Sequence, residues 1–135
     1  MLLFFGYTHC PDVCPTTMAD FQGVHHRLGP RAGQVKFVFV SVDPKRDTPK
    51  VVADYAHNFS PDFIGLTGDS ATLAAVEHSF HVDSYMEMDS TGQYSMAHSA
   101  SVFVVDKDGT ITETLRFAGP QEETLYAMTD SLLAR

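Results

Sequence analysis

The sequence predicts a single α/β domain in which helices flank a mixed central β-sheet. Three observations support this fold class. Short apolar runs alternate with segments of helical spacing, which is the pattern of a layered sheet. An Asp-Gly pair between two later strand-like runs predicts an antiparallel hairpin. The length of 135 residues suits one domain with a core of its own.

The first half of the chain is expected to alternate strand and helix, over residues 2–6, 15–28, 35–42 and 49–58. Pro15 fits the first helical turn, where its missing N–H costs nothing, and Gly29 followed by proline ends that helix. Asp47 or Thr48 is expected to cap the second helix. The strand over 35–42 is apolar enough to be buried on both faces.

The second half is expected to hold a strand at 63–66, a helix from Ser70, an inserted hairpin near 82–97, strands at 101–105 and 110–117, and a helix at 121–133. A polar, Met-rich composition around a Thr91-Gly92 turn predicts the inserted hairpin. Asp108-Gly109 joins the two later strands. This order of elements matches a thioredoxin-like, peroxiredoxin-related layered fold.

Charge and hydropathy exclude several classes of function. The formal net charge of −8 disfavours binding to nucleic acid, because an acidic surface repels phosphates. No apolar stretch approaches the roughly 20 residues that a membrane span needs. The apolar residues at the start follow no basic region, so they do not form a signal peptide. Since the sequence begins inside a predicted strand, we expect a truncated chain that has lost any export signal or anchor.

The strongest chemical signal is the segment CPDVCP, residues 10–15, between a predicted strand and a predicted helix. A helix N-terminus offers unpaired N–H groups and a positive dipole end, which favour the thiolate form of cysteine. Cys10 and Cys14 are four residues apart, so one helical turn can bring both sulfurs to the same side. Two thiolates suit Cu(I), and the same pair could form a disulfide.

The two cysteines have three other interpretations. They could be buried and unreactive, but a turn at the end of a strand is expected to be exposed and polar. A structural zinc site would need two further ligands at knuckle spacing, and no second pair is present. The three intervening residues also differ from the two of a thioredoxin-type redox motif.

Three segments together resemble the Sco/SenC family of copper proteins. GYTHCPDVCPTT, residues 6–17, resembles that family's metal-binding segment, and VSVDPKRDTP, residues 40–49, resembles its second signature. MAHS, residues 96–99, is similar to the third, which carries a histidine ligand. The resemblance covers nearly the whole chain. It implies one thioredoxin-like copper-binding domain over 1–135, without the anchor and first strands that family members carry upstream.

His98 is the third ligand that the resemblance implies, beside Cys10 and Cys14. In this fold, the loop that enters the strand at 101–105 lies beside the N-terminus of the first helix. A neutral imidazole there would complete a site of two sulfurs and one nitrogen, which can hold Cu(I) or Cu(II). A histidine with no such context is more often a surface or core residue.

Other soft or basic side chains are weaker candidates. Met86, Met88 and Met96 could touch copper, although packing of the inserted hairpin explains them better. His25 and His26 are expected to be solvated on the first helix. His9 is expected to point away from its neighbour Cys10, and His57, His78 and His81 have no ligand-like neighbours in the sequence.

Asp43, Arg46 and Asp47 follow the predicted strand at 35–42, at a sheet edge where ligands commonly bind. They could orient the metal-binding loop or contact a partner. Alternatively, they supply only turn and capping interactions.

The resemblance implies a copper metallochaperone that helps to assemble the binuclear copper site of cytochrome c oxidase. Its partner would be the copper-site subunit of the oxidase or another copper or thiol protein, at the periplasmic face of the inner membrane or in the mitochondrial intermembrane space. The alternative is an enzyme, a thiol–disulfide oxidoreductase in which Cys10 and Cys14 are catalytic. A thiol peroxidase and a copper sensor are further alternatives. A chaperone is favoured over an enzyme.

Overall fold

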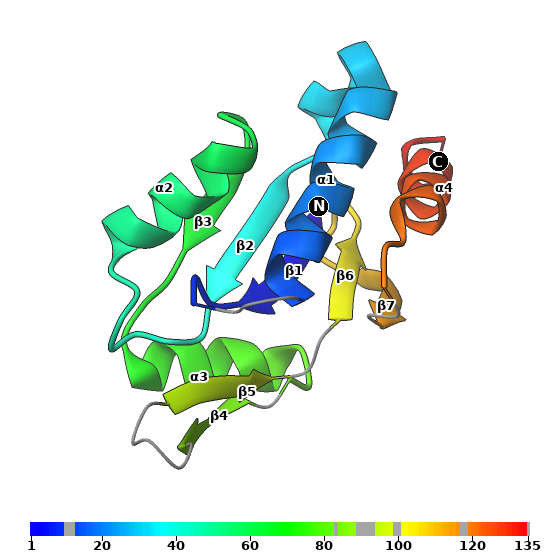
Figure 1. The fold of residues 1–135 in the computed structure, drawn as a ribbon. Coiled ribbons are helices and arrows are strands. Elements are labelled where there is room, and N and C mark those ends of the chain that lie inside the picture. Colours follow the sequence, from blue (N-terminus) through cyan, green and yellow to red (C-terminus); the bar gives the residue numbers. More distant parts are fainter. Residues whose placement is uncertain (10–12, 83, 89–93, 99–100, 117–118, 135) are drawn as a thin grey trace.

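The computed structural model describes residues 1–9, 13–82, 84–88, 94–98, 101–116 and 119–134 (Figure 1). The elements occur in the order β1 (Leu2–Gly6), α1 (Val13–Leu28), the 3₁₀ helix η1 (Gly29–Gln34), β2 (Phe37–Ser41), α2 (Pro49–Phe59), β3 (Ile64–Leu66), α3 (Ser70–Ser79), β4 (Ser84–Met88), β5 (Tyr94–His98), β6 (Ser101–Val105), β7 (Ile111–Arg116) and α4 (Glu122–Leu133). Cys10 and the predicted Thr91-Gly92 turn lie outside the described residues.

The main sheet has five strands in the order β3-β2-β1-β6-β7. Strands β1, β2 and β3 run parallel, whereas β6 is antiparallel to β1 and β7 is antiparallel to β6. The prediction of a mixed sheet flanked by helices is therefore confirmed. Strand β1 is central, and its Phe4 lies opposite Phe39 of β2 and Val102 of β6.

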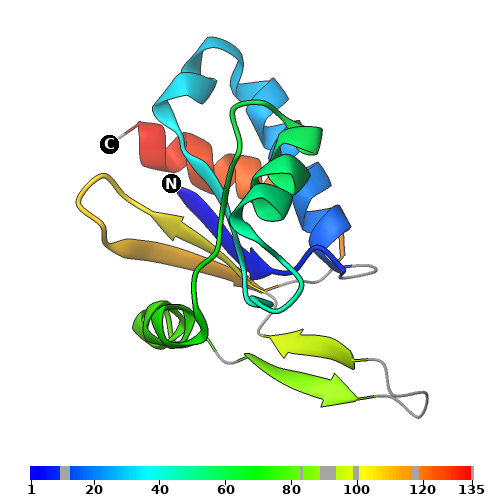
Figure 2. The same cartoon turned by 90° about the vertical axis from the view of Figure 1, so that its left-hand side faces the viewer.

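Helices cover both faces of this sheet (Figure 2). Leu2 and Phe4 face the core formed with α1, α2 and α4, while Leu3 and Phe5 face the core formed with α3. Successive side chains of a strand point to opposite faces, so a strand covered on both sides must be apolar throughout. This explains the uninterrupted apolar run at the start of the sequence.

Helix α1 buries the side chains predicted for its inner face, Met18, Phe21 and Val24. It ends at Leu28, as expected. The chain then continues as η1, because Gly29 adopts a φ of +55° and the following proline begins a new short turn. The predicted stop signal therefore ends the α-helix but not the helical path.

The inserted hairpin is present as a two-stranded sheet of β4 and β5, which projects from the main body (Figure 2). Its register places Ser84 opposite His98. The second predicted hairpin joins β6 and β7, and its Gly109 has a φ of +84°. There the carboxylate of Asp106 accepts hydrogen bonds from the backbone N–H of Asp108 and of Thr110.

Thr48 is the residue that caps α2. Its side-chain oxygen accepts a hydrogen bond from the Val51 backbone N–H at 3.2 Å. Asp47, the other residue predicted as a possible cap, does not cap this helix. Among the helices that the structure describes, none is long and apolar enough to cross a membrane.

Candidate metal centre

Cys14 lies in the first turn of α1 and is fully buried. It belongs to the apolar core together with Phe4 and Met18. A Cβ atom added to Gly6 would lie only 2.5 Å from the Cys14 sulfur, so the sulfur packs directly over the end of β1. The turn was expected to be exposed, but the helix turns this side chain into the core instead.

The other two predicted ligands are described less fully. Cys10 lies outside the described residues. His98 is the last residue of β5, and its side chain is also outside the description. Within the described residues, no group of three His, Cys, Asp or Glu side chains could hold a metal ion. The proposed set of two cysteines and one histidine therefore stays a prediction.

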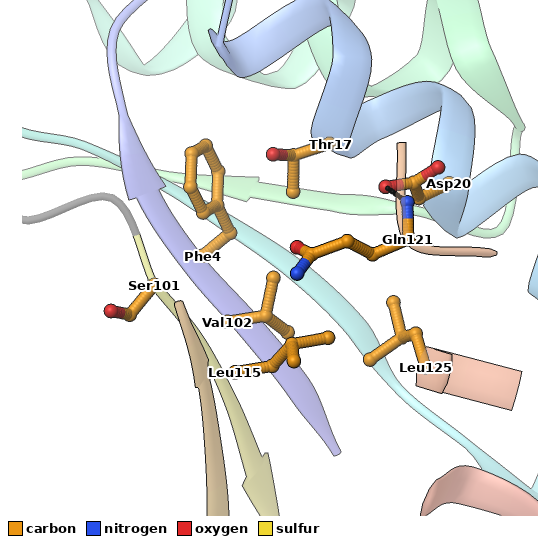
Figure 3. Close-up of a pocket in the computed structure, with 8 residues that line it drawn as sticks. All are labelled: Phe4, Thr17, Asp20, Ser101, Val102, Leu115, Gln121 and Leu125. Atoms are coloured by element: carbon orange, nitrogen blue, oxygen red, sulfur yellow. Dashed lines mark hydrogen bonds between the residues drawn. The ribbon is translucent and has the colours of Figure 1, made fainter. Parts of the chain in front are cut away.

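The structure does bring the start of β6 close to the start of α1. Ser101, three residues after His98, and Thr17, three residues after Cys14, line the same small pocket with Phe4 of β1 (Figure 3). The end of β5 is thus joined by a two-residue connection to a point beside the first turns of α1. Residues 99 and 100, which connect β5 to β6, lie outside the described residues, so the positional argument for His98 stays a prediction.

The segment that leads into Cys10 is held by a buried carboxylate. Asp47 is 1% exposed. Its Oδ2 accepts hydrogen bonds from the Thr8 backbone N–H at 2.9 Å and from the Ser41 hydroxyl at 2.6 Å. Its Oδ1 accepts one from the Thr8 hydroxyl at 2.5 Å. These bonds agree with the interpretation in which Asp47 orients the segment that leads into Cys10, because they join Asp47 to Thr8.

Asp43 and Arg46 form a second contact beneath the same loop. Asp43 is buried and accepts a hydrogen bond from Arg46 Nε at 2.5 Å. The Arg46 guanidinium lies 5.8 Å from the centre of the Tyr7 ring, within range of a cation–π interaction. Tyr7 and Thr8, which directly follow β1, therefore contact the turn that precedes α2.

Sequence reasoning did not single out Tyr7, Thr8 or Ser41. All three lie inside the segments that resemble family signatures, 6–17 and 40–49. Their spacing, however, gives no sign that Thr8 contacts a carboxylate 39 positions away. Only pairing of β1 with β2 brings the ends of the two segments together.

The histidines near the first helix also find partners. His9 is half exposed, and its Nδ1 lies 3.9 Å from Asp47 Oδ1. His25, expected to be solvated, is instead packed edge-on against Phe37 and Phe63, with its Nε2 2.9 Å from a carboxylate oxygen of Asp62.

Comparison with known proteins identifies the family. A family model described as SCO1/SenC matches residues 1–133. The chain belongs to the SCO1/SenC family. The SCO2-like protein of Rickettsia prowazekii is 38% identical over 111 residues, covering 80% of this chain and 54% of that protein. The mitochondrial SCO2 homolog of Bos taurus is 35% identical over 135 residues, covering 98% of this chain and 49% of the homolog. The chain thus spans about half the length of these curated relatives.

Solved structures of Sco proteins share the fold. ScoI of Bradyrhizobium japonicum with copper bound is 39% identical and superposes with a TM-score of 0.85, covering 97% of this chain and 83% of that one. ScoI of Arabidopsis thaliana with copper bound is 28% identical with a TM-score of 0.89, covering 98% and 83% of the two chains. The thioredoxin-like fold class of this SCO1/SenC protein is confirmed.

Proposed function

We propose that this chain is a copper metallochaperone in which Cys10, Cys14 and His98 bind one copper ion as cargo. Membership of the SCO1/SenC family supports this proposal, as does the copper held by ScoI of Bradyrhizobium japonicum. The observation that carries it is the position of Cys14, in the first turn of α1 with its sulfur packed over the end of β1.

The donor chemistry fits copper. The first turn of α1 carries no acidic side chain, and the positive end of a helix dipole favours a thiolate over a thiol. Soft thiolates select Cu(I), and an imidazole nitrogen extends the range of the site to Cu(II). Transfer to another protein would proceed by exchange of ligands, with one sulfur of the donor replaced by one sulfur of the acceptor at a time.

We further propose that the acceptor is the copper-site subunit of cytochrome c oxidase, or another copper or thiol protein. The compartment would be the periplasmic face of the inner membrane or the mitochondrial intermembrane space. The family resemblance supports both statements, and the Bos taurus homolog is itself named as mitochondrial.

Anaerobic titration of the reduced protein with Cu(I) tests the site. One copper ion should remain bound to each chain after desalting, because one dithiol and one histidine make one site. Cys10→Ser should abolish tight binding, since a hydroxyl is a poor ligand for Cu(I). Retention of copper by the Cys10→Ser/Cys14→Ser variant would contradict the ligand assignment.

The alternative function, a thiol–disulfide oxidoreductase, uses the same two sulfurs. It is favoured only by the dithiol beside a helix terminus, which also suits thiol–disulfide exchange. His98→Ala separates the two functions. It should remove Cu(II) binding and weaken Cu(I) binding, while the two cysteines still cycle between dithiol and disulfide.

His57→Ala is the matched control for this test, because His57 is exposed on α2 and remote from the proposed ligands in sequence. Support of oxidase assembly should be lost in His98→Ala and kept in His57→Ala. Preserved assembly by His98→Ala despite lost copper binding would favour the oxidoreductase.

A further inference from the structure

We propose that Asp47 is a positioning residue that fixes the separation of the two cysteines by holding the segment before Cys10. The part of this inference that concerns copper rests on the proposed function. The part that concerns the pairing of the two sulfurs does not, because any reaction that joins them depends on the same geometry.

Asp47 binds Thr8 through two hydrogen bonds. One carboxylate oxygen accepts a hydrogen bond from the Thr8 hydroxyl, and the other accepts one from the Thr8 backbone N–H. A hydrogen bond to an ionised acceptor is stronger than one between neutral groups, and two such bonds fix orientation as well as distance. Thr8 is only two residues from Cys10, so we expect these bonds to restrict the backbone that leads into this cysteine.

The carboxylate is itself fixed by β2. The hydroxyl of Ser41, the last residue of β2, donates to the same oxygen that binds the Thr8 N–H. The Asp47 backbone N–H donates to the Asp43 carbonyl at 2.9 Å, which closes the turn before α2. Because Thr48 caps α2, Asp47 is not needed for that task. Its side chain therefore serves the segment after β1.

Both ends of the segment between Thr8 and Cys14 are thus anchored. At its beginning, the Val42 N–H donates to the Gly6 carbonyl at 2.8 Å, and Asp47 holds Thr8. At its end, Cys14 is buried in the core under α1. A chain with fixed ends loses less freedom when its two sulfurs are joined, whether by copper or by an S–S bond.

Removal of the Asp47–Thr8 hydrogen bonds should therefore weaken both the copper complex and the Cys10–Cys14 disulfide. Asp47→Asn replaces the carboxylate with a neutral amide whose NH₂ group faces donors. Thr8→Val deletes the hydroxyl and keeps the backbone N–H. Each variant should lower Cu(I) affinity by about 10- to 100-fold, the usual effect of losing a group that orients a ligand. Each should also shift the Cys10–Cys14 pair of the copper-free protein toward the dithiol in a glutathione redox buffer.

Two controls distinguish positioning from a general loss of stability. Asp20→Asn alters another buried carboxylate, which accepts the backbone N–H of Gln121 at 3.0 Å, just before α4, rather than that of Thr8. It should leave copper affinity and the disulfide equilibrium unchanged. Thr8→Ser keeps both donors and should behave like the natural protein, which shows that any loss in Thr8→Val comes from the missing hydroxyl. If Thr8→Val does not fold, Asp47→Asn tests the same contact from the other side.

The double variant Asp47→Asn/Thr8→Val should bind Cu(I) as tightly as the weaker-binding of the two single variants. Both changes remove the same contact, so their effects should not add. The inference is overturned if folded Asp47→Asn matches the natural protein in both measurements, or if Asp20→Asn changes them as much. Failure of the natural protein to bind copper would refute the proposed function alone, since the glutathione equilibrium still measures the effect of Asp47.

Discussion

Gly6→Ala tests whether Cys14 is packed as tightly as the structure shows. The added Cβ would lie 2.5 Å from the Cys14 sulfur, 2.9 Å from Phe39 Cε2 and 3.1 Å from Phe4 Cε1. Comfortable non-bonded separations are about 3.5–4.0 Å, so each neighbour must move by roughly 0.5–1 Å. Gly6 has no positive φ, and alanine would therefore be destabilising through crowding alone.

Overpacking of this kind costs about 1–3 kcal/mol. With a loss of about 2 kcal/mol and a urea dependence of about 2 kcal/mol per molar, the unfolding midpoint should fall by about 1 M. The midpoint is measured by circular dichroism. Because the methyl group displaces the Cys14 sulfur, Cu(I) affinity in a competition assay should fall as well.

Gly33→Ala is the matched control, since a Cβ there meets nothing within 4 Å. Its midpoint should stay within a few tenths of a molar of the natural protein, because a surface substitution usually changes stability by no more than about 0.5 kcal/mol. An unchanged midpoint in Gly6→Ala would refute the reasoning, because it would mean that Cys14 does not occupy this position.

Two further predictions concern helix ends and buried charge. Thr48→Ala should destabilise the domain by about 1 kcal/mol in urea unfolding, because α2 loses its side-chain cap, and Thr48→Ser should restore it. Burial raises the pKa of Asp20 above its ordinary value, and the nearby Glu122 adds to that rise. The stability that this group contributes is therefore present below an ordinary aspartate pKa and is lost as pH rises through the raised value. The stability of Asp20→Asn relative to the natural protein should accordingly improve between pH 3 and pH 7, and a constant difference would contradict this.

Strands made of continuous apolar residues were the most predictable part of the fold. Residues 2–6 and 101–105 match β1 and β6, because a run buried on both faces has no polar position to blur its ends. The strand predicted over 35–42 is shorter, at Phe37–Ser41, since Lys36 is exposed at its start. Hairpin turns were predictable where a glycine must adopt a positive φ, as Gly109 does.

Parts of the candidate site could not be predicted, because they depend on contacts between distant segments. Local sequence offers Asp47 and Thr48 equally as caps for α2. Only the hydrogen bonds to Thr8 show which of them is left for the loop. The burial of Cys14 likewise depends on the end of β1 lacking a side chain at Gly6.

The separate sheet of β4 and β5 has a consequence for how cargo could leave. Cys14 belongs to the main core, whereas His98 ends a two-stranded hairpin, an element of marginal stability on its own. The proposed ligands Cys14 and His98 would therefore lie on parts of the fold that differ in stability, the main core and the β4–β5 hairpin. Displacing the nitrogen would need only a shift of the hairpin, while displacing the Cys14 sulfur would need the core to open. In the transfer proposed above, the recipient protein would therefore meet a copper ion that has first lost its histidine ligand and is still bound by sulfur.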